Sequence, residues 1–423
     1  MTSKARLFLV DHMCILPYGH NLNALILFRD ALKAHFSETE CLACRDLPDY
    51  AEQGEHVRRV LSYPYDGTVA RAPKRKPEKS KRKSLPERLL SLASQPLPRR
   101  AFYTGVSEIF RFDIVRSRTL RDWRRTLKQF KMTDADSIFM PSVDFYGAMT
   151  LLEVLLRLPV SERPRVHLRM IGVSENARYS RRPARPELLR YIRRAIKAGI
   201  RVSVSAETLT YKTYLERLLN TPVTYLPYPL ANEFEPLNWG QPKTVTSPGQ
   251  AREDKGIYRF VGIISSLLSD AVPNAYRFDV QGMRVTDDSY RARYFDVLRN
   301  IPGMLLRPAR LSQPEIDDAY RQADILVLPY DGNTYALRGS AVYQEGIAIG
   351  RPMVCSRGLG FSDLALRYGN GLLAEREVEF AQQIRKLAEM PKSEVEAMVA
   401  KARAAYAADF ENGLASVLKE FNP

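Results

Sequence analysis

Two hydrophobic spacings alternate along the chain. Short apolar runs that suit buried strands are followed by longer segments whose apolar positions lie three and four apart, as on one face of a helix. In the N-terminal half this alternation predicts strands at 6–10, 137–140, 165–171 and 201–205, and helices at 22–35, 146–157, 186–198 and 209–219. Such an alternation is typical of a parallel sheet that is covered on both faces.

A proline-rich stretch at 221–242 interrupts the alternation, and we expect an interdomain linker there because each proline resists helix continuation. A second alternation follows and predicts strands at 244–247, 276–281, 304–307, 324–329 and 352–355, helices at 256–270, 289–300, 313–322 and 339–349, and a last helix at 392–421. The pattern predicts an α/β protein with two Rossmann-like, doubly wound domains that face a cleft, and a C-terminal helix that crosses between them. The expected domain boundaries are 1–225, 226–391 and 392–423.

Length and composition agree with this organisation. The 423 residues are enough for two domains, and 45% hydrophobic with 26% charged residues is ordinary for a globular protein. No stretch approaches the ~20 uncharged apolar residues of a membrane helix. Asp11 and His12 interrupt the first apolar run, so it suits a core strand better than a secretory signal. We therefore expect a cytoplasmic protein.

The positive charge is concentrated in one segment. The chain has a net charge of +16, and residues 71–100 hold eleven lysines or arginines against two glutamates. This basic tract lies in a stretch at about 64–120 that we interpret as an insertion or mobile loop of the first domain. Its charge predicts docking to an anionic membrane surface, at the inner face of the cytoplasmic membrane. A nucleic-acid-binding protein is the alternative, although we find no groove-reading module.

The loop that opens the second domain suits a phosphate group. Gly249 allows a ligand to approach the backbone closely, and the helix that follows offers free N–H groups and a positive dipole end. Arg252 and Lys255 lie three residues apart in the same loop, so both side chains can reach one anionic group. Two solvated cations are the alternative, but cations at a helix start are mildly unfavourable for the helix, which favours a ligand.

A second polar site is predicted at the start of the helix at 339–349. Arg338, Gly339 and Ser340 stand where that helix begins, which is again a position that attracts an anion. Glu345 lies one and a half turns further on, among apolar residues, and a carboxylate in such surroundings needs a partner. That partner is either a structural arginine or the hydroxyl groups of a bound ribose.

These motifs together resemble the donor domain of family 4 glycosyltransferases, a family of the GT-B type. The similar segments are PGQAREDKG at 248–256, LSQPEIDDAYRQADILVLPYDGN at 311–333 and GSAVYQEGIAIGRPMVCSRGLGFSDLALRYGNGLLAE at 339–375. Each piece is short, but their order and spacing agree, and the similarity covers about residues 222–380. The N-terminal half is similar in architecture only.

The resemblance implies a role for each matching residue. Arg252 and Lys255 would hold the diphosphate of a nucleotide sugar, and Glu345 would bind the ribose. Gly358 and Gly360 would bring backbone close to the nucleotide or the sugar. The expected donor-binding set is completed by Gly249, Arg338, Gly339 and Ser340.

One position departs from the family pattern. The family usually has a first glutamate eight residues before the ribose-binding one, and that position here is Leu337. The departure leaves open the identity of the donor sugar. It also leaves a catalytically inactive GT-B-fold binding or scaffold protein as an alternative.

The reaction that the resemblance implies is glycosyl transfer, with retention of configuration, from a nucleotide-diphosphate sugar to a polysaccharide, glycolipid or other glycan acceptor. Arg252 and Lys255 would stabilise the charge that develops on the leaving diphosphate, so neither a metal nor a further cofactor is expected. The leaving phosphate itself would take the acceptor proton.

The first strand–helix turn of the N-terminal half holds Gly19, His20 and Asn21, and we expect all three to face the cleft. His20 is the third expected catalytic residue, because an imidazole titrates near neutral pH and can orient or move a proton. Ordinary polar packing of this histidine is the alternative.

Two short motifs invite a metal-binding interpretation. Cys41 and Cys44 form a lone C-x-x-C without a second ligand pair at zinc spacing, so we expect reduced, buried thiols. Asp134 and Asp136 form a D-x-D motif just before a strand, where hydrogen bonding within the turn is the expected role. The sequence therefore predicts no metal site.

Overall fold

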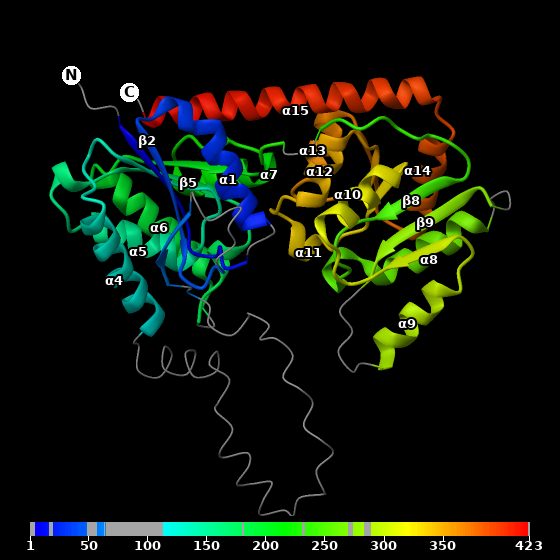
Figure 1. The fold of residues 1–423 in the computed structure, drawn as a ribbon, viewed down its shortest axis with the longest axis horizontal. Helices are drawn as coiled ribbons and strands as arrows, with labels where there is room; N and C mark the ends of the chain where they lie inside the picture. The colour runs from blue at the N-terminus through cyan, green and yellow to red at the C-terminus, as the bar shows by residue number, and fades with distance from the viewer. Residues whose placement is uncertain are drawn as a thin grey trace, which may run out of the picture. The chain divides into compact units, whose positions relative to one another are not determined.

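The computed structural model describes residues 5–16, 20–48, 57–62, 64, 113–179, 182–230, 233–269, 274–282 and 289–421 (Figure 1). Contacts divide the chain into two compact units, Met1–Ser203 and Val204–Pro423. The division falls inside strand β6 (Val202–Ala206), so the elements that follow this strand are counted with the second unit.

The first sheet is parallel, with the strand order β3-β2-β1-β4-β5-β6-β7. Besides β6, its strands are β1 (Arg6–Asp11), β2 (Glu38–Cys44), β3 (Val57–Leu61), β4 (Ser137–Met140), β5 (Arg165–Met170) and β7 (Thr224–Tyr225). The order in which strands are added reverses between the central neighbours β1 and β4, where Leu7 lies opposite Ser137. In open α/β sheets, ligands bind at the carboxyl ends of strands at such a reversal.

The helices around this sheet are α1 (His20–Leu32), α4 (Ile114–Gln129), α5 (Phe145–Leu155), α6 (Ala184–Lys197) and α7 (Leu209–Leu219). In Figure 1, α4, α5 and α6 lie side by side, and α5 contacts both of the others. Every residue of α5 is consequently buried. This helix begins at the cap residue Asp144, whose carboxylate accepts a hydrogen bond from the backbone N–H of Gly147 at 2.8 Å.

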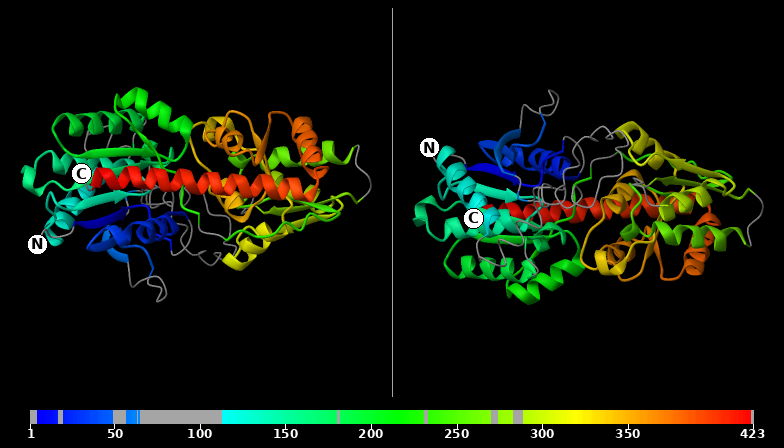
Figure 2. Two further views of the ribbon diagram at one scale, coloured as in Figure 1. Left: turned by 90° about the horizontal axis from the view of Figure 1, so that it is seen from above. Right: turned by 90° about the horizontal axis from the view of Figure 1, so that it is seen from below.

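The second sheet is also parallel, with the strand order β10-β9-β8-β11-β12-β13 and a reversal between β8 and β11. Its strands are β8 (Lys243–Ser247), β9 (Tyr276–Gln281), β10 (Met304–Arg307), β11 (Ile325–Leu328), β12 (Met353–Ser356) and β13 (Gly371–Ala374). The helices are α8 (Ile257–Leu268), α9 (Ser289–Arg299), α10 (Gln313–Gln322), α11 (Gly332–Tyr335), α12 (Ala341–Ile349), α13 (Ser362–Tyr368), α14 (Glu377–Ala388) and α15 (Lys392–Phe421). Figure 2 shows α15 as one uninterrupted helix, and it contacts α12, α13 and β7.

The predicted alternation of strands and helices is confirmed, and the last helix has the predicted bounds. The elements that the sequence analysis did not predict are β2, β3, β7, β13, α4, α11, α13 and α14. In β3 and α4 the apolar positions lie among arginines, which hides their periodicity. The predicted insertion at 64–120 needs a correction at its end, since Ile114–Leu120 form the first turns of α4, which packs into the fold through the buried Trp123. The basic tract at 71–100 lies outside the described residues.

The C-x-x-C and D-x-D motifs were considered above for metal binding, and the structure shows what surrounds Cys41, Cys44 and Asp136. Cys41 and Cys44 are buried thiols on β2, and burial raises the pKa of each to about 12, which keeps them protonated. Asp136 pairs with Arg6 at 2.9 Å and accepts a hydrogen bond from the backbone N–H of Thr133 at 2.8 Å, as expected for a turn residue. Among the described helices, none is both long and apolar enough to cross a bilayer.

Candidate functional site

The loops that leave β8 and β11 meet at the carboxyl edge of the second sheet. Gly256 follows the short 3-10 turn Glu253–Lys255 and starts α8 in the left-handed region, at a φ of 72°. Any side chain at Gly256 would overlap the carbonyl oxygen of Pro329, which directly follows β11. The two loops are therefore in close backbone contact at the strand reversal, which is where the general rule for these sheets places a ligand.

The two predicted cations, Arg252 and Lys255, lie in the loop after β8, residues 248–256, which we call the cation loop. Arg252 donates hydrogen bonds to the Tyr335 hydroxyl at 2.7 Å and to Asp254 at 2.9 Å. The Lys255 ammonium lies beside Gly249, where a Cβ would be only 2.8 Å from Nζ, and 5.7 Å from the centre of the Tyr330 ring.

Burial and, after it, the positive charge of Arg252 lower the pKa of Lys255 to about 8, although the negative charges of Glu345 and Asp254 oppose the shift. Within the described part of the chain, the Lys255 ammonium has no ion pair. A half-buried ammonium with a depressed pKa is a candidate for binding an anion, because a bound anion favours its charged form.

Helix α12 carries Glu345 close enough to Lys255 for their charges to interact. Its carboxylate accepts a hydrogen bond from the Tyr320 hydroxyl at 2.5 Å, and Tyr320 is itself fully buried on α10. Burial raises the pKa of Glu345, whereas the Tyr320 hydroxyl and Lys255 lower it. The sequence predicted a partner for the Glu345 carboxylate but did not identify it. In the structure that partner is Tyr320, which no rule of sequence spacing indicated. The remaining acceptor sites of the carboxylate suit a diol.

The segment before α12 is held by aromatic and capping contacts. The Arg338 guanidinium lies 5.9 Å from the centre of the Tyr335 ring, whose hydroxyl already binds Arg252. Ser340 caps α12 by accepting a hydrogen bond from the backbone N–H of Tyr343 at 3.3 Å. The structure therefore brings the predicted residues of this segment close to the cation loop.

The two glycines after β12 differ in their surroundings. The backbone N–H of Gly360 donates to the carbonyl of Tyr335 at 2.8 Å, and a Cβ there would lie 2.6 Å from the carbonyl carbon of Leu337. Gly360 thus has a packing reason to be glycine. Gly358 has a φ of 75° and nothing within 4 Å of a Cβ position, so its backbone is open to a ligand.

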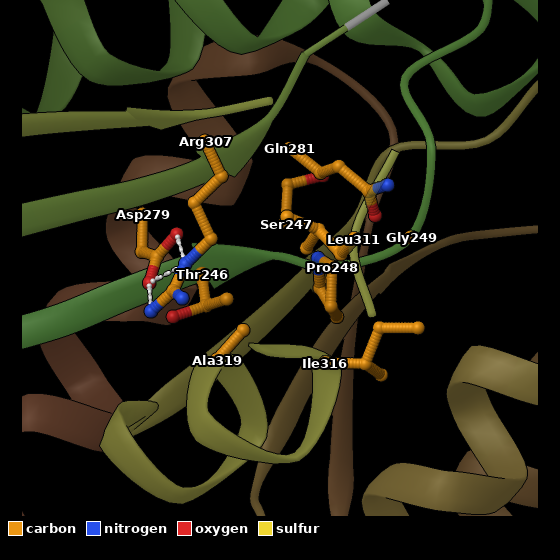
Figure 3. Close-up of a pocket in the computed structure, with 10 residues that line it drawn as sticks. All are labelled: Thr246, Ser247, Pro248, Gly249, Asp279, Gln281, Arg307, Leu311, Ile316 and Ala319. Carbon is orange, nitrogen blue, oxygen red and sulfur yellow. Dashed lines mark hydrogen bonds and ion pairs between the residues drawn. The ribbon is translucent and has the colours of Figure 1, made fainter. Parts of the chain in front are cut away.

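A pocket lies next to the cation loop, at the ends of β8, β9 and β10 (Figure 3). It opens to solvent, and its enclosed space is small, about 10 Å³, which is roughly the room of one water molecule. Its polar wall is made by Arg307, which binds Asp279 at 2.8 Å and Asp318 at 3.0 Å. The lining residues are Thr246, Ser247, Pro248, Gly249, Asp279, Gln281, Arg307, Leu311, Ile316 and Ala319. Gly249 borders both this pocket and the Lys255 ammonium.

The predicted residues of the first strand–helix turn are only partly described. Gly19 lies outside the described residues, and His20 is the first residue of α1. The Asn21 side chain donates to Asp11 at 2.9 Å, and burial raises the pKa of that carboxyl group to about 7. Asn21 therefore has a structural partner at the end of β1.

A buried pair that the sequence reasoning missed lies at the reversal between β1 and β4. His12 Nδ1 is 3.7 Å from Asp144 Oδ2, and neither side chain is exposed. Burial lowers the pKa of His12 to about 3 and raises that of Asp144 to about 7. A side chain at Gly147 would overlap both groups. A histidine directly after the first strand was the available signal for this pair.

A comparison with family descriptions identifies part of the chain. Residues 242–390 match the family described as Glycosyl transferases group 1. These residues form a glycosyl transferases group 1 domain. The glycosyltransferase domain contains Arg252, Lys255, Glu345 and the other predicted donor-site residues, from Gly249 to Gly360.

Solved structures resemble the whole chain. Sucrose-phosphate synthase from Thermosynechococcus elongatus is 13% identical, with 98% of each chain covered and a TM-score of 0.63. A structure described as trehalose-6-phosphate from E. coli bound with UDP-2-fluoro glucose is 12% identical, with 99% of each chain covered and a TM-score of 0.62. A UDP-forming α,α-trehalose-phosphate synthase from Burkholderia xenovorans, in complex with glucose-6-phosphate, is 12% identical, with 99% of this chain and 100% of that chain covered and a TM-score of 0.58.

These likenesses establish the fold, which is the predicted GT-B fold with two parallel α/β sheets. At identities this low they say nothing of the substrate. A comparison with curated protein sequences finds no match.

Proposed function

We propose that this protein is a glycosyltransferase that moves a sugar from a nucleotide-diphosphate sugar to a glycan or glycolipid acceptor. The observation that carries the proposal is the meeting of Arg252, Lys255 and Glu345 at the strand reversal of the glycosyltransferase domain. One structure of the same fold holds UDP-2-fluoro glucose, a nucleotide-diphosphate sugar of the proposed class.

The proposed chemistry needs stabilisation of a leaving diphosphate. Arg252 offers a planar fork to phosphate oxygens, and Lys255 adds a partly desolvated charge, which acts more strongly than a charge in water. Glu345 would orient the nucleotide by accepting hydrogen bonds from the ribose. In this proposal the two cations do the work of a metal. The family resemblance implies retention, so the acceptor oxygen bonds to the sugar carbon on the face from which the diphosphate leaves, and the leaving phosphate takes the acceptor proton there.

The test is nucleotide binding to the parent protein and to Lys255→Ala and Glu345→Ala. We expect at least one of UDP, GDP, ADP and CMP to raise the Tm of the parent, and each variant to lose that shift. Lys392→Ala and Glu396→Ala are the matched controls, because they remove an exposed ion pair on α15 and should keep the shift. Binding by both site variants at the parent level would refute the assignment of the site.

Catalysis itself is tested by a screen of nucleotide sugars for hydrolysis and transfer. Leu337 stands where the family usually has a glutamate, which keeps an inactive binding protein of the same fold as the second candidate. Measurable turnover with any donor would eliminate that candidate.

Membrane docking through residues 71–100 stays part of the proposal. The charge of this tract supports an anionic surface as its partner, which would hold a lipid-linked acceptor at the inner membrane face. Deletion of 71–100 should abolish salt-dependent binding to anionic vesicles and leave the nucleotide shift unchanged. Tight, salt-dependent binding to nucleic acid with no binding to vesicles would favour the nucleic-acid alternative instead.

A further inference from the structure

Two helices of the first compact unit carry exposed stripes of positive charge. Each stripe has basic residues at positions i, i+3, i+4 and i+7, which lie on one face of a helix. The two cationic stripes consist of Arg121, Arg124, Arg125 and Lys128 on α4, and of Arg190, Arg193, Arg194 and Lys197 on α6. Each stripe is about 10 Å long, because a helix rises about 1.5 Å per residue.

The carboxylates of these helices do not neutralise the stripes. Asp122, the one acidic residue of α4, is buried and pairs with Arg125 at 2.6 Å. Glu187, the one acidic residue of α6, pairs with Arg178, which lies outside the stripes. Within the part of the chain that the structure describes, the stripe residues other than Arg125 form no ion pair. Their charges therefore remain available to a partner.

A face with charges of one sign is unfavourable for the helix that carries it. Each stripe holds cations three and four residues apart, such as Arg190 and Arg194, and each such pair destabilises a helix by about 0.2–0.5 kcal/mol. The dipole of α6 offsets this repulsion only in the last turn, where Arg194 and Lys197 lie. Ordinary soluble surfaces intersperse both signs of charge. The stripes consequently favour an anionic partner that compensates for the repulsion.

The arrangement of the two helices indicates what kind of partner fits. Both α4 and α6 pack against α5 (Figure 1), and every residue of α5 is buried. Since packed helices lie about 8–10 Å apart, the two stripes are roughly 20 Å apart in one layer. A planar anionic surface can contact both stripes at once, whereas an extended polyanion can follow only one. Neither helix is free to enter a groove, which reading a nucleic acid requires.

We propose that the cationic stripes of α4 and α6 form a docking face for an anionic phospholipid bilayer. The inference rests on the membrane docking proposed above and deepens it, because stable membrane anchoring takes two signals. The tract at 71–100 supplies one signal and the stripes supply the other, so the loss of either releases the protein. The tract ends shortly before α4 begins, which makes the two signals continuous along the chain. Arginine suits this role, because its planar fork matches the oxygens of a phosphate headgroup.

The test measures co-sedimentation of the full chain with vesicles of phosphatidylglycerol mixed with phosphatidylcholine, and with vesicles of phosphatidylcholine alone. One variant replaces the whole α6 stripe by glutamine. A second replaces Arg121, Arg124 and Lys128 but keeps Arg125, because Arg125 pairs with a buried carboxylate. The matched control removes four exposed lysines of the second compact unit through Lys386→Gln, Lys392→Gln, Lys401→Gln and Lys419→Gln. Glutamine has nearly the helix propensity of arginine and lysine, so each variant should keep the parent Tm.

We expect the parent to bind the vesicles that contain phosphatidylglycerol, in a salt-dependent manner, and not those of phosphatidylcholine alone. Each stripe variant should bind about 100- to 1000-fold more weakly, since each basic residue near an anionic surface contributes about 1 kcal/mol. The control variant should bind as the parent does, because its lysines lie outside the stripes.

The inference is wrong if either stripe variant binds as tightly as the parent, or if the control loses as much affinity as the stripe variants. Loss of binding on deletion of 71–100 would then still support docking through the tract, so the two failures are distinguishable. Tighter binding of the parent to duplex DNA than to anionic vesicles would overturn the choice of partner. A parent that binds no anionic vesicle would overturn both membrane proposals, whereas the nucleotide shift tests the glycosyltransferase proposal independently.

Discussion

We predict that the affinity for a nucleoside diphosphate falls as the pH rises through about 8, because Lys255 loses its proton there. The pKa of this ammonium is depressed in the free protein, first by burial and then by Arg252. A bound diphosphate favours the charged form, so binding and protonation are linked. Below pH 7 most molecules already carry the charge that the diphosphate needs, whereas above pH 8 most molecules have to take up a proton when they bind it.

The magnitude follows from the same pKa. With a pKa of about 8, roughly nine-tenths of the molecules carry the charge at pH 7, half at pH 8 and one-tenth at pH 9. The Kd should therefore rise about tenfold per unit above pH 8. The rise should level off after about 10- to 150-fold in total, since a charge-assisted hydrogen bond contributes about 1.5–3 kcal/mol. The diphosphate adds little to this trend, because a phosphate has its second pKa near 6.

Isothermal titration calorimetry between pH 7 and 9.5, with whichever of UDP and GDP binds, measures the effect in two ways. The Kd gives the slope, and buffers of different ionisation enthalpy give the proton uptake, which should be about 0.1 at pH 7 and 0.5 at pH 8. Lys255→Met should bind weakly with no slope, while Lys392→Met on α15 should behave as the parent does. A parent Kd that stays flat from pH 7 to 9.5, or a Lys255→Met variant that retains the slope, would refute the reasoning.

Two further predictions concern the frame of the site. Gly256→Ala should cost about 2–5 kcal/mol and lower the Tm by about 4–20 °C, because it adds overlap with Pro329 to the strain of a left-handed residue. Gly369→Ala shares the positive φ but has nothing within 4 Å, so it should lower the Tm by only about 2–8 °C; equal shifts in differential scanning calorimetry would contradict the close contact. Tyr320→Phe removes a buried donor from Glu345 and should cost about 1–3 kcal/mol in chemical denaturation, with weaker nucleotide binding. A variant as stable as the parent would show that Glu345 does not depend on that hydroxyl.

Much of the fold could be predicted from local patterns. A buried strand and an amphipathic helix each have a period that is visible within a few residues, and the alternation of the two leaves few topologies open. Some elements rich in charged residues could not be predicted in this way. In α4, for example, the buried positions around Trp123 lie among basic residues, which obscures the helical period. The cation loop was also predictable, since Gly249, Arg252 and Lys255 lie close together in the sequence.

What the sequence by itself determined is therefore the class of fold and the place of the short motifs that we propose to bind phosphate. Only the tertiary structure decided which groups are partners. Tyr320 binds Glu345 across 25 residues, and Glu207 meets Gly339 across 132, so neither contact follows from a local rule. The reason is physical: a local period reports which face of an element is buried, whereas partners depend on which strands become neighbours and where their ends meet.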